Sequence, residues 1–131
     1  MIIKSFEAEK IKSLKNNLIL LYGANEGHKN QVINELFKIF FKGEVLRFEE
    51  NEILTNQERV ISNLMNKSLF EEEKLIIISR ASDKILKLIN EIIEREIDKI
   101  KIIINSGILE KKSKLRNLFE KNKNLICIPF Y

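Results

Sequence analysis

The fold of this chain is decided by the stretch LILLYGANEGHKN, residues 18–30. Its first part, LILLY, is an apolar run that predicts a buried β-strand, and the pattern turns helical after the polar residues that follow. The connection contains Gly23, Gly27 and Lys29. A glycine loop between a buried strand and a helix is typical of phosphate-binding P-loops, whose backbone amides surround the phosphates.

The stretch departs from a working P-loop, G-x-x-x-x-G-K-[ST], at two positions. Counted from Gly23, the second glycine falls at His28 and the magnesium-binding hydroxyl falls at Asn30, whereas Lys29 is in place. A Cβ at His28 hinders close approach of the backbone to phosphate. Asn is a poorer magnesium ligand than Ser or Thr. We therefore expect a vestigial loop that attracts at most a stray anion and does not hydrolyse nucleotide.

Short apolar runs alternate with longer amphipathic stretches, which indicates an α/β domain with a mainly parallel sheet. The predicted strands span residues 18–22, 44–47, 75–79, 101–105 and 125–128. Three are nearly all aliphatic, as in strands covered on both faces, while the second alternates and is expected at an edge. Pro129 is expected to close the last strand. The sequence therefore predicts a three-layer, P-loop-like domain with a five-stranded sheet flanked by helices.

The helices are predicted from apolar residues at helical spacing. They span residues 7–15, 28–41, 56–66, 83–97 and 111–121. Ser82 or Asp83 is expected to cap the fourth helix. The glutamates at 49, 50 and 52, and those at 71–73, are interpreted as solvated turns.

A P-loop ATPase also needs an acidic residue at the end of a buried strand to hold magnesium. The third predicted strand ends instead in Ser79-Arg80, and the fourth in Asn105-Ser106. Polar residues after the fourth strand suit either a γ-phosphate sensor or the start of a loop, and we favour the loop. The missing acid is a further reason to expect no catalysis.

Composition limits the other classes of function. The 131 residues are 44% hydrophobic and 32% charged, as in one globular domain covering residues 1–131. No apolar run reaches the roughly 18 residues of a membrane span. A single histidine and a single cysteine argue against a metal site, and Cys127 is expected to be a core thiol in a reducing cytoplasm. We expect no cofactor and no metal.

The formal net charge is +4, and much of it lies late in the chain. The basic segment 111–123 suits either contact with a nucleic-acid backbone or the solvated face of a helix. We favour the solvated face, and keep nucleic-acid binding through residues 111–121 as an alternative.

The order of these motifs resembles the N-terminal domain of the bacterial DNA polymerase III delta subunit, the clamp-loader subunit that opens the sliding clamp. The resemblance covers residues 17–131. It is carried by LLYG at 20–23, SLF at 68–70 before KLIII at 74–78, III at 102–104 and KKSKL at 111–115. The delta-prime subunit is the relative most easily confused with it.

The resemblance implies a fold of the AAA+ type and a subunit that does not itself hydrolyse ATP. It implies the sliding clamp (the beta subunit) and the other clamp-loader subunits as partners, with DNA contacted only indirectly or in the full assembly. The chain ends about where the first domain of the family ends, so the second domain and the collar domain of the family would be absent. A divergent P-loop NTPase or kinase using Lys29 remains the alternative from a different class.

The resemblance also implies a clamp-binding wedge at Ser68, Leu69 and Phe70. From the residues alone, an apolar pair between NKS and EEE is either an exposed anchor or a pair packed inward. With the resemblance we favour the anchor. Some members of the family carry an apolar residue where this chain has Lys67, so a smaller wedge is expected, and Met65 is expected in the core.

Overall fold

The computed structural model describes residues 1–13, 16–38, 41–67, 73–96 and 100–131. The strands are β1 (Leu18–Tyr22), β2 (Glu44–Glu49), β3 (Lys74–Ala81), β4 (Ile100–Ser106) and β5 (Ile126–Pro129). The α-helices are α1 (Glu26–Val32), α2 (Glu50–Thr55), α3 (Gln57–Lys67), α4 (Leu86–Glu94) and α5 (Lys114–Lys121). Three further helical segments are the 3₁₀ helices η1 (Ser5–Ser13) and η3 (Asp83–Ile85) and the π-helical η2 (Ile33–Lys38).

The strands form one sheet in the order β2-β3-β4-β1-β5, and every neighbouring pair is parallel. This confirms the α/β class, the five-stranded sheet and the edge position of the second strand. β1, β3 and β4 are buried along most of their length, whereas β2 is partly exposed, as the alternating pattern predicted. Pro129 is the last residue of β5, as expected.

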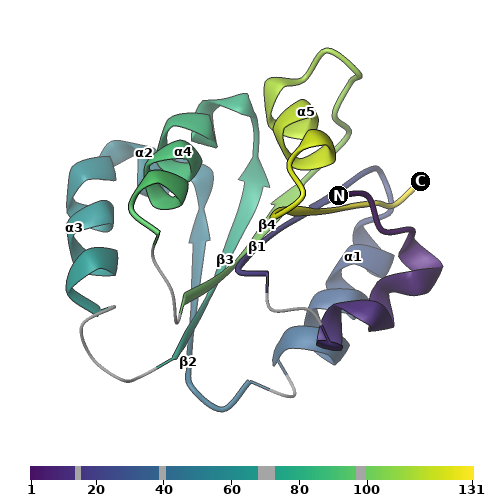
Figure 1. The fold of residues 1–131 in the computed structure, drawn as a ribbon, viewed down its shortest axis with the longest axis horizontal. Coiled ribbons are helices and arrows are strands. Elements are labelled where there is room, and N and C mark those ends of the chain that lie inside the picture. Colours follow the sequence, from purple (N-terminus) through teal and green to yellow (C-terminus); the bar gives the residue numbers. More distant parts are fainter. Residues whose placement is uncertain (14–15, 39–40, 68–72, 97–99) are drawn as a thin grey trace.

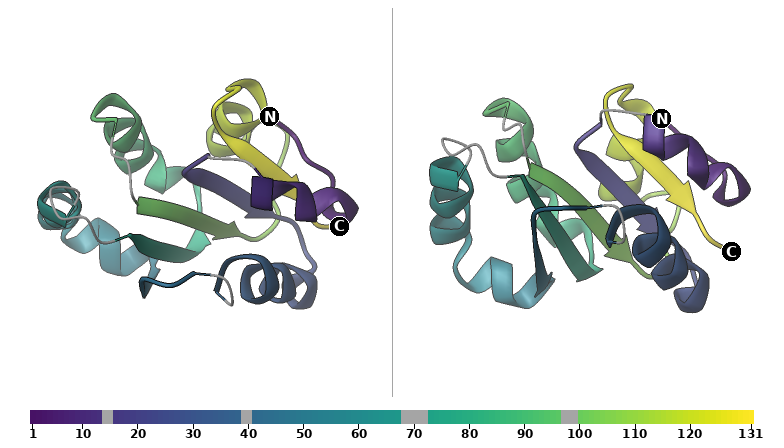
Figure 2. Two further views of the ribbon diagram at one scale, coloured as in Figure 1. Left: turned by 60° about the horizontal axis from the view of Figure 1, so that its bottom comes forward. Right: turned by 90° about the horizontal axis from the view of Figure 1, so that it is seen from below.

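Helices cover both faces of the sheet (Figures 1 and 2). On one face, α3, α4 and α5 pack over a core that contains Leu20, Ile78 and Ile104. On the other, α1, η1 and η2 pack over residues such as Leu21, Ile77 and Ile103. Alternate residues of each strand thus enter different cores, which explains the continuous aliphatic runs.

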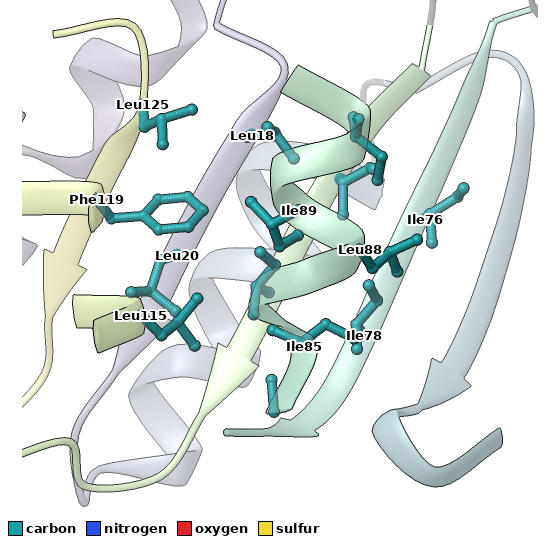
Figure 3. Packing of buried hydrophobic residues seen from close by; sticks show 14 of the residues in the cluster. Leu18, Leu20, Ile76, Ile78, Ile85, Leu88, Ile89, Leu115, Phe119 and Leu125 are labelled. Carbon is teal, nitrogen blue, oxygen red and sulfur yellow. The ribbon is translucent and has the colours of Figure 1, made fainter. Parts of the chain in front are cut away.

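Figure 3 shows the larger core at close range. Ile85, Leu88 and Ile89 lie between α4 and the sheet, where they face strand residues such as Ile76 and Ile78. Leu115 and Phe119 bring α5 onto the same layer. Cys127 is fully buried in this core, as predicted, and burial raises the pKa of its thiol to about 12.

The first residues run beside β5. The Ile3 amide donates to the Cys127 carbonyl and the Cys127 amide donates to the Met1 carbonyl, each at 2.9 Å. The Met1 amino group donates to the carbonyls of Phe119, Asn122 and Leu125, at the carboxyl end of α5. These bonds occupy part of the outer edge of β5.

Several predicted helices differ from the observed ones. The second begins two residues earlier, at Glu26, and changes to a π-helical turn at Ile33. The fifth begins only at Lys114, because Ser113 caps it by accepting from the Arg116 amide at 3.2 Å. The first is a 3₁₀ helix over residues 5–13, and the fourth starts as the 3₁₀ turn η3 and ends at Glu94.

The interpretation of the glutamates at 49–52 as a solvated turn was wrong. These residues begin α2, where the Glu49 side chain and the Glu52 side chain form a reciprocal capping box. Glu50 is buried and bonds to Ser82. The sequence signal of a capping box has Ser, Thr, Asp or Asn three residues ahead of Glu or Gln, so a glutamate at the cap position did not predict this helix.

Candidate functional site

The candidate site is the crevice between the carboxyl ends of β1 and β4. These strands are neighbours, but the helix after β1 (α1) covers one face of the sheet and the helix after β4 (α5) covers the other. Open α/β sheets bind their ligands in such a crevice, because the loops diverge there. The glycine loop lies at this position.

Position 23 requires glycine because of its backbone conformation and its close packing against Phe130. The φ of Gly23 is +125°, and a Cβ would lie 1.8 Å from the Phe130 carbonyl oxygen. Its amide donates to the Gly107 carbonyl at 2.9 Å, so the loop after β1 is bonded to the loop after β4. The requirement for glycine is therefore explained by the approach of residue 130.

The loop after β1 is short, and α1 begins at Glu26. The Asn25 side chain accepts from the His28 amide and its carbonyl accepts from the Lys29 amide, both at 3.1 Å. These amides are consequently engaged within the chain. A Cβ at Gly27 would find its nearest neighbour at 3.9 Å, so the second glycine has no steric role.

His28, which stands where a P-loop has its second glycine, packs edge-on against Phe130. The ring centroids are 4.8 Å apart and the planes cross at 87°. The contact holds the His28 ring against Phe130, whereas residues 24–27 of the loop are exposed.

Lys29 fills the crevice. Its side chain is fully buried, and its ammonium donates to Glu26 Oε1 at 2.5 Å and to the Ser106 carbonyl at 2.6 Å. The lysine thus links the start of α1 to the end of β4. Its charge is compensated by Glu26, whose side chain is 62% exposed, and by the buried Ser106 carbonyl.

The strand ends carry the predicted polar residues. Ser79 and Asn105 are partners in the β3–β4 register, and the register shifts between Ser79 and Ala81. Arg80, at the shift, has a φ of +56°. Ser106 is buried, and its hydroxyl has no hydrogen-bond partner among the described residues.

Two carboxylates join the loops of this edge, one interpreted from the sequence as part of a solvated turn and the other as a possible helix cap. Glu50 accepts from the Ser82 hydroxyl at 2.7 Å and from the Ser82 amide at 2.6 Å. Ser82 in turn caps η3. It is one of the two residues predicted to cap the fourth helix.

Asp83, the other predicted cap position, caps a different helix. Its carboxylate accepts from the Ser113 hydroxyl at 2.6 Å and from the amides of Lys114 and Leu115 at 3.1 Å. These bonds, the Ser113 hydroxyl first, lower the pKa of Asp83 from its ordinary value. Only the fold brings η3 to the start of α5, so no local pattern predicts this contact.

Some basic side chains of the segment around α5 are bonded to other groups of the protein. Arg116 donates to Glu120 Oε1 at 2.7 Å and to the Leu109 carbonyl at 2.9 Å, and it lies over the Tyr22 ring. The Nζ of Lys112 lies 3.4 Å from Glu110 Oε2. The solvated-face interpretation thus describes the lysines better than it describes Arg116.

The predicted wedge, Ser68, Leu69 and Phe70, lies outside the described residues. α3 ends at Lys67, and β3 begins at Lys74 at the amino edge of the sheet. A hollow of about 510 Å³ is lined at this edge by apolar residues that include Leu64 and Ile100.

Among the residues described, no cluster of His, Cys, Asp or Glu is suited to hold a metal ion. Within the same residues, no helix combines the length and the apolar character needed to cross a bilayer. No protein-family model matches this chain, and no curated protein matches it.

Proposed function

We propose that this chain is an AAA+-type domain of a clamp-loader delta subunit, which binds a DNA polymerase sliding clamp and opens the ring without hydrolysing ATP. The observation that carries the proposal is the buried Lys29. This lysine is bonded to Glu26 and to the Ser106 carbonyl, so its ammonium is not available to a nucleotide phosphate. The fold of a nucleotide-binding domain with an occupied crevice suits a subunit that works mechanically.

The parallel sheet with a glycine loop after β1 supports the AAA+ assignment. The partner assignment is supported by the sequence resemblance and by the apolar pair Leu69-Phe70, which stands between polar residues in the sequence. Along the chain the pair falls between the end of α3 at Lys67 and the start of β3 at Lys74.

The mechanism is a shift of population. Leu69 and Phe70 insert into an apolar pocket of one clamp protomer and bind the open ring better than the closed ring, so the open state becomes populated. Truncation of well-packed interface anchors costs about 2–4 kcal/mol each. ATP acts on other subunits of the loader.

The test is capture of the sliding clamp of the same organism by the chain. The double variant Leu69→Ala/Phe70→Ala should lose clamp binding and keep the circular dichroism spectrum of the parent. Phe6→Ala is the matched control, because Phe6 is 80% exposed and belongs to η1 on another part of the molecule. Wild-type affinity in the double variant would refute the assignment of the wedge.

Calorimetry with ATP and magnesium separates this proposal from a P-loop NTPase or kinase. We expect no tight binding of ATP. Tight binding that is lost in Lys29→Ala would favour the enzyme instead.

A further inference from the structure

We propose that a polar hollow over the carboxyl ends of β3 and β4 binds a small oxyanion of the phosphate type. Two adjoining hollows, of about 550 and 450 Å³, share the residues Asn30, Ser79 and Asn105. Serine hydroxyls and asparagine amides donate hydrogen bonds to oxyanions. The site lies beside the crevice that Lys29 fills and extends away from it, toward β2.

The strongest observation is the orphaned hydroxyl of Ser106. Ser106 lines the first hollow and is only 1% exposed, and its Oγ has no partner in the part of the chain that the structure describes. A buried hydroxyl without a partner is costly, and such groups are rare in folded proteins. A bound oxyanion supplies the missing acceptor.

Two arginines give the hollow its charge. Arg80 lines the first hollow and Arg47 of β2 lines the second. Of the described residues that line either hollow, Glu26 is the one carboxylate, and it is bonded to Lys29 at 2.5 Å. The lining therefore favours an anion, and guanidinium groups form strong bonds to phosphate oxygens.

The backbone at Arg80 is a second sign of a specialised site. A φ of +56° is uncommon for a residue other than glycine, and here it coincides with a shift in the strand register. Such irregularities re-aim a side chain next to binding sites. The Arg80 side chain is 83% exposed, and its Nε lies 3.8 Å from Glu49 Oε1, so a ligand competes only with this surface ion pair for the guanidinium.

The ligand is a single oxyanion group. A triphosphate needs the amides and the lysine of a P-loop, and here Asn25 engages the amides of His28 and Lys29 while the Lys29 ammonium is bonded elsewhere. The inference is independent of the proposed clamp binding, because it rests on Arg47, Arg80 and Ser106 and not on the proposed wedge at residues 68–70.

The test is an NMR titration of the whole chain with sodium phosphate, against sodium chloride at matched ionic strength. We expect saturable shifts of the amide signals of Ser79, Arg80, Asn105 and Ser106. Shifts that match those in chloride, or that centre on other residues, would overturn the proposal.

Two variants locate the ligand. Arg47→Ala should weaken phosphate binding about tenfold or more, because it removes a charge-assisted bond. Arg59→Ala is the control, since Arg59 is also exposed but lines a different hollow next to α3. Equal affinity in the parent and in Arg47→Ala would refute the site.

Ser106→Ala addresses the orphaned hydroxyl. Without phosphate, the variant should melt at a temperature equal to or above that of the parent, because an unpaired buried group has been removed. With phosphate it should gain less stability than the parent. An equal gain in both proteins would show that the hydroxyl does not contact the anion.

ATP is the last ligand to be tested. We expect ATP without magnesium to bind no more tightly than inorganic phosphate. Tighter binding that depends on Lys29 would replace the proposal with a nucleotide site.

Discussion

At the carboxyl edge of the sheet the loops are joined by buried or capping charged groups, whereas at the amino edge an apolar hollow is rimmed by asparagines. Lys29, Glu50 and Asp83 each bond to a different element at the carboxyl edge. The hollow at the amino edge is lined by residues such as Leu64 and Ile92, with Asn16 and Asn124 among the polar ones.

The comparison teaches how a ligand-binding fold can change its use. Enzymes with open parallel sheets keep the crevice at the carboxyl edge free for a ligand. In this chain the crevice at the switch point is occupied by the chain's own lysine. Substitutions at the carboxyl edge should therefore affect stability strongly, and substitutions at the amino edge should affect it little.

The largest effect is expected for Lys29→Ala. The variant leaves a cavity and removes the donor to the Ser106 carbonyl, and it should lower the free energy of unfolding by about 3 kcal/mol. Lys29→Met, which keeps most of the volume, should lose less. Urea denaturation measures both, with the exposed Lys87→Ala as control. If Lys29→Ala lowered the free energy of unfolding no more than Lys87→Ala does, the proposed difference between the two edges of the sheet would be wrong.

Glu50→Ala should come next. Glu50 is 6% exposed, and its removal leaves the hydroxyl and the amide of Ser82 without their acceptor. A loss of about 2 kcal/mol follows from unpaired buried groups. Glu94→Ala, at an exposed position of α4, is the control in the same urea titration. Equal losses in the two variants would show that Glu50 does not join the loops.

Asp83→Asn should cost about 1 kcal/mol at neutral pH, as for the loss of a helix cap. The pKa of Asp83 is lowered in the folded protein from the ordinary value of 3.8. Its stabilising effect is thus complete above that value and disappears as the pH falls through the lowered pKa. Unfolding measured from pH 7 down to about pH 2 should show the parent and the variant converging. A constant difference would contradict the role of the carboxylate charge.

The smallest effect is expected at the amino edge, for Glu96→Gly. Glu96 follows α4 with a φ of +49°, which glycine adopts more readily. The variant should gain about 0.5–1 kcal/mol of stability. Glu91→Gly, inside α4, should instead lose about 1 kcal/mol. Thermal melting distinguishes the two signs, and a loss in Glu96→Gly would argue that this edge is also held by specific bonds.

The sequence predicted the sheet well and the helix ends less well. The aliphatic runs at 18–22 and 75–78 specify strands because alternate residues enter two different cores. The start of α1 was missed because Asn25 caps the helix earlier than the P-loop pattern suggests. The glutamates of α2 were misread because composition alone does not distinguish a capped helix from a turn.

The sequence by itself determined the α/β class, the glycine after β1 and the polar ends of β3 and β4, since these depend on hydrophobic period and local backbone geometry. Only the tertiary structure decided that Lys29 bonds to Ser106, that Asp83 caps α5 and that Gly23 is packed against Phe130. Each of these contacts joins residues at least 30 positions apart. They form only once the order of parallel strands has brought the loops together at one edge.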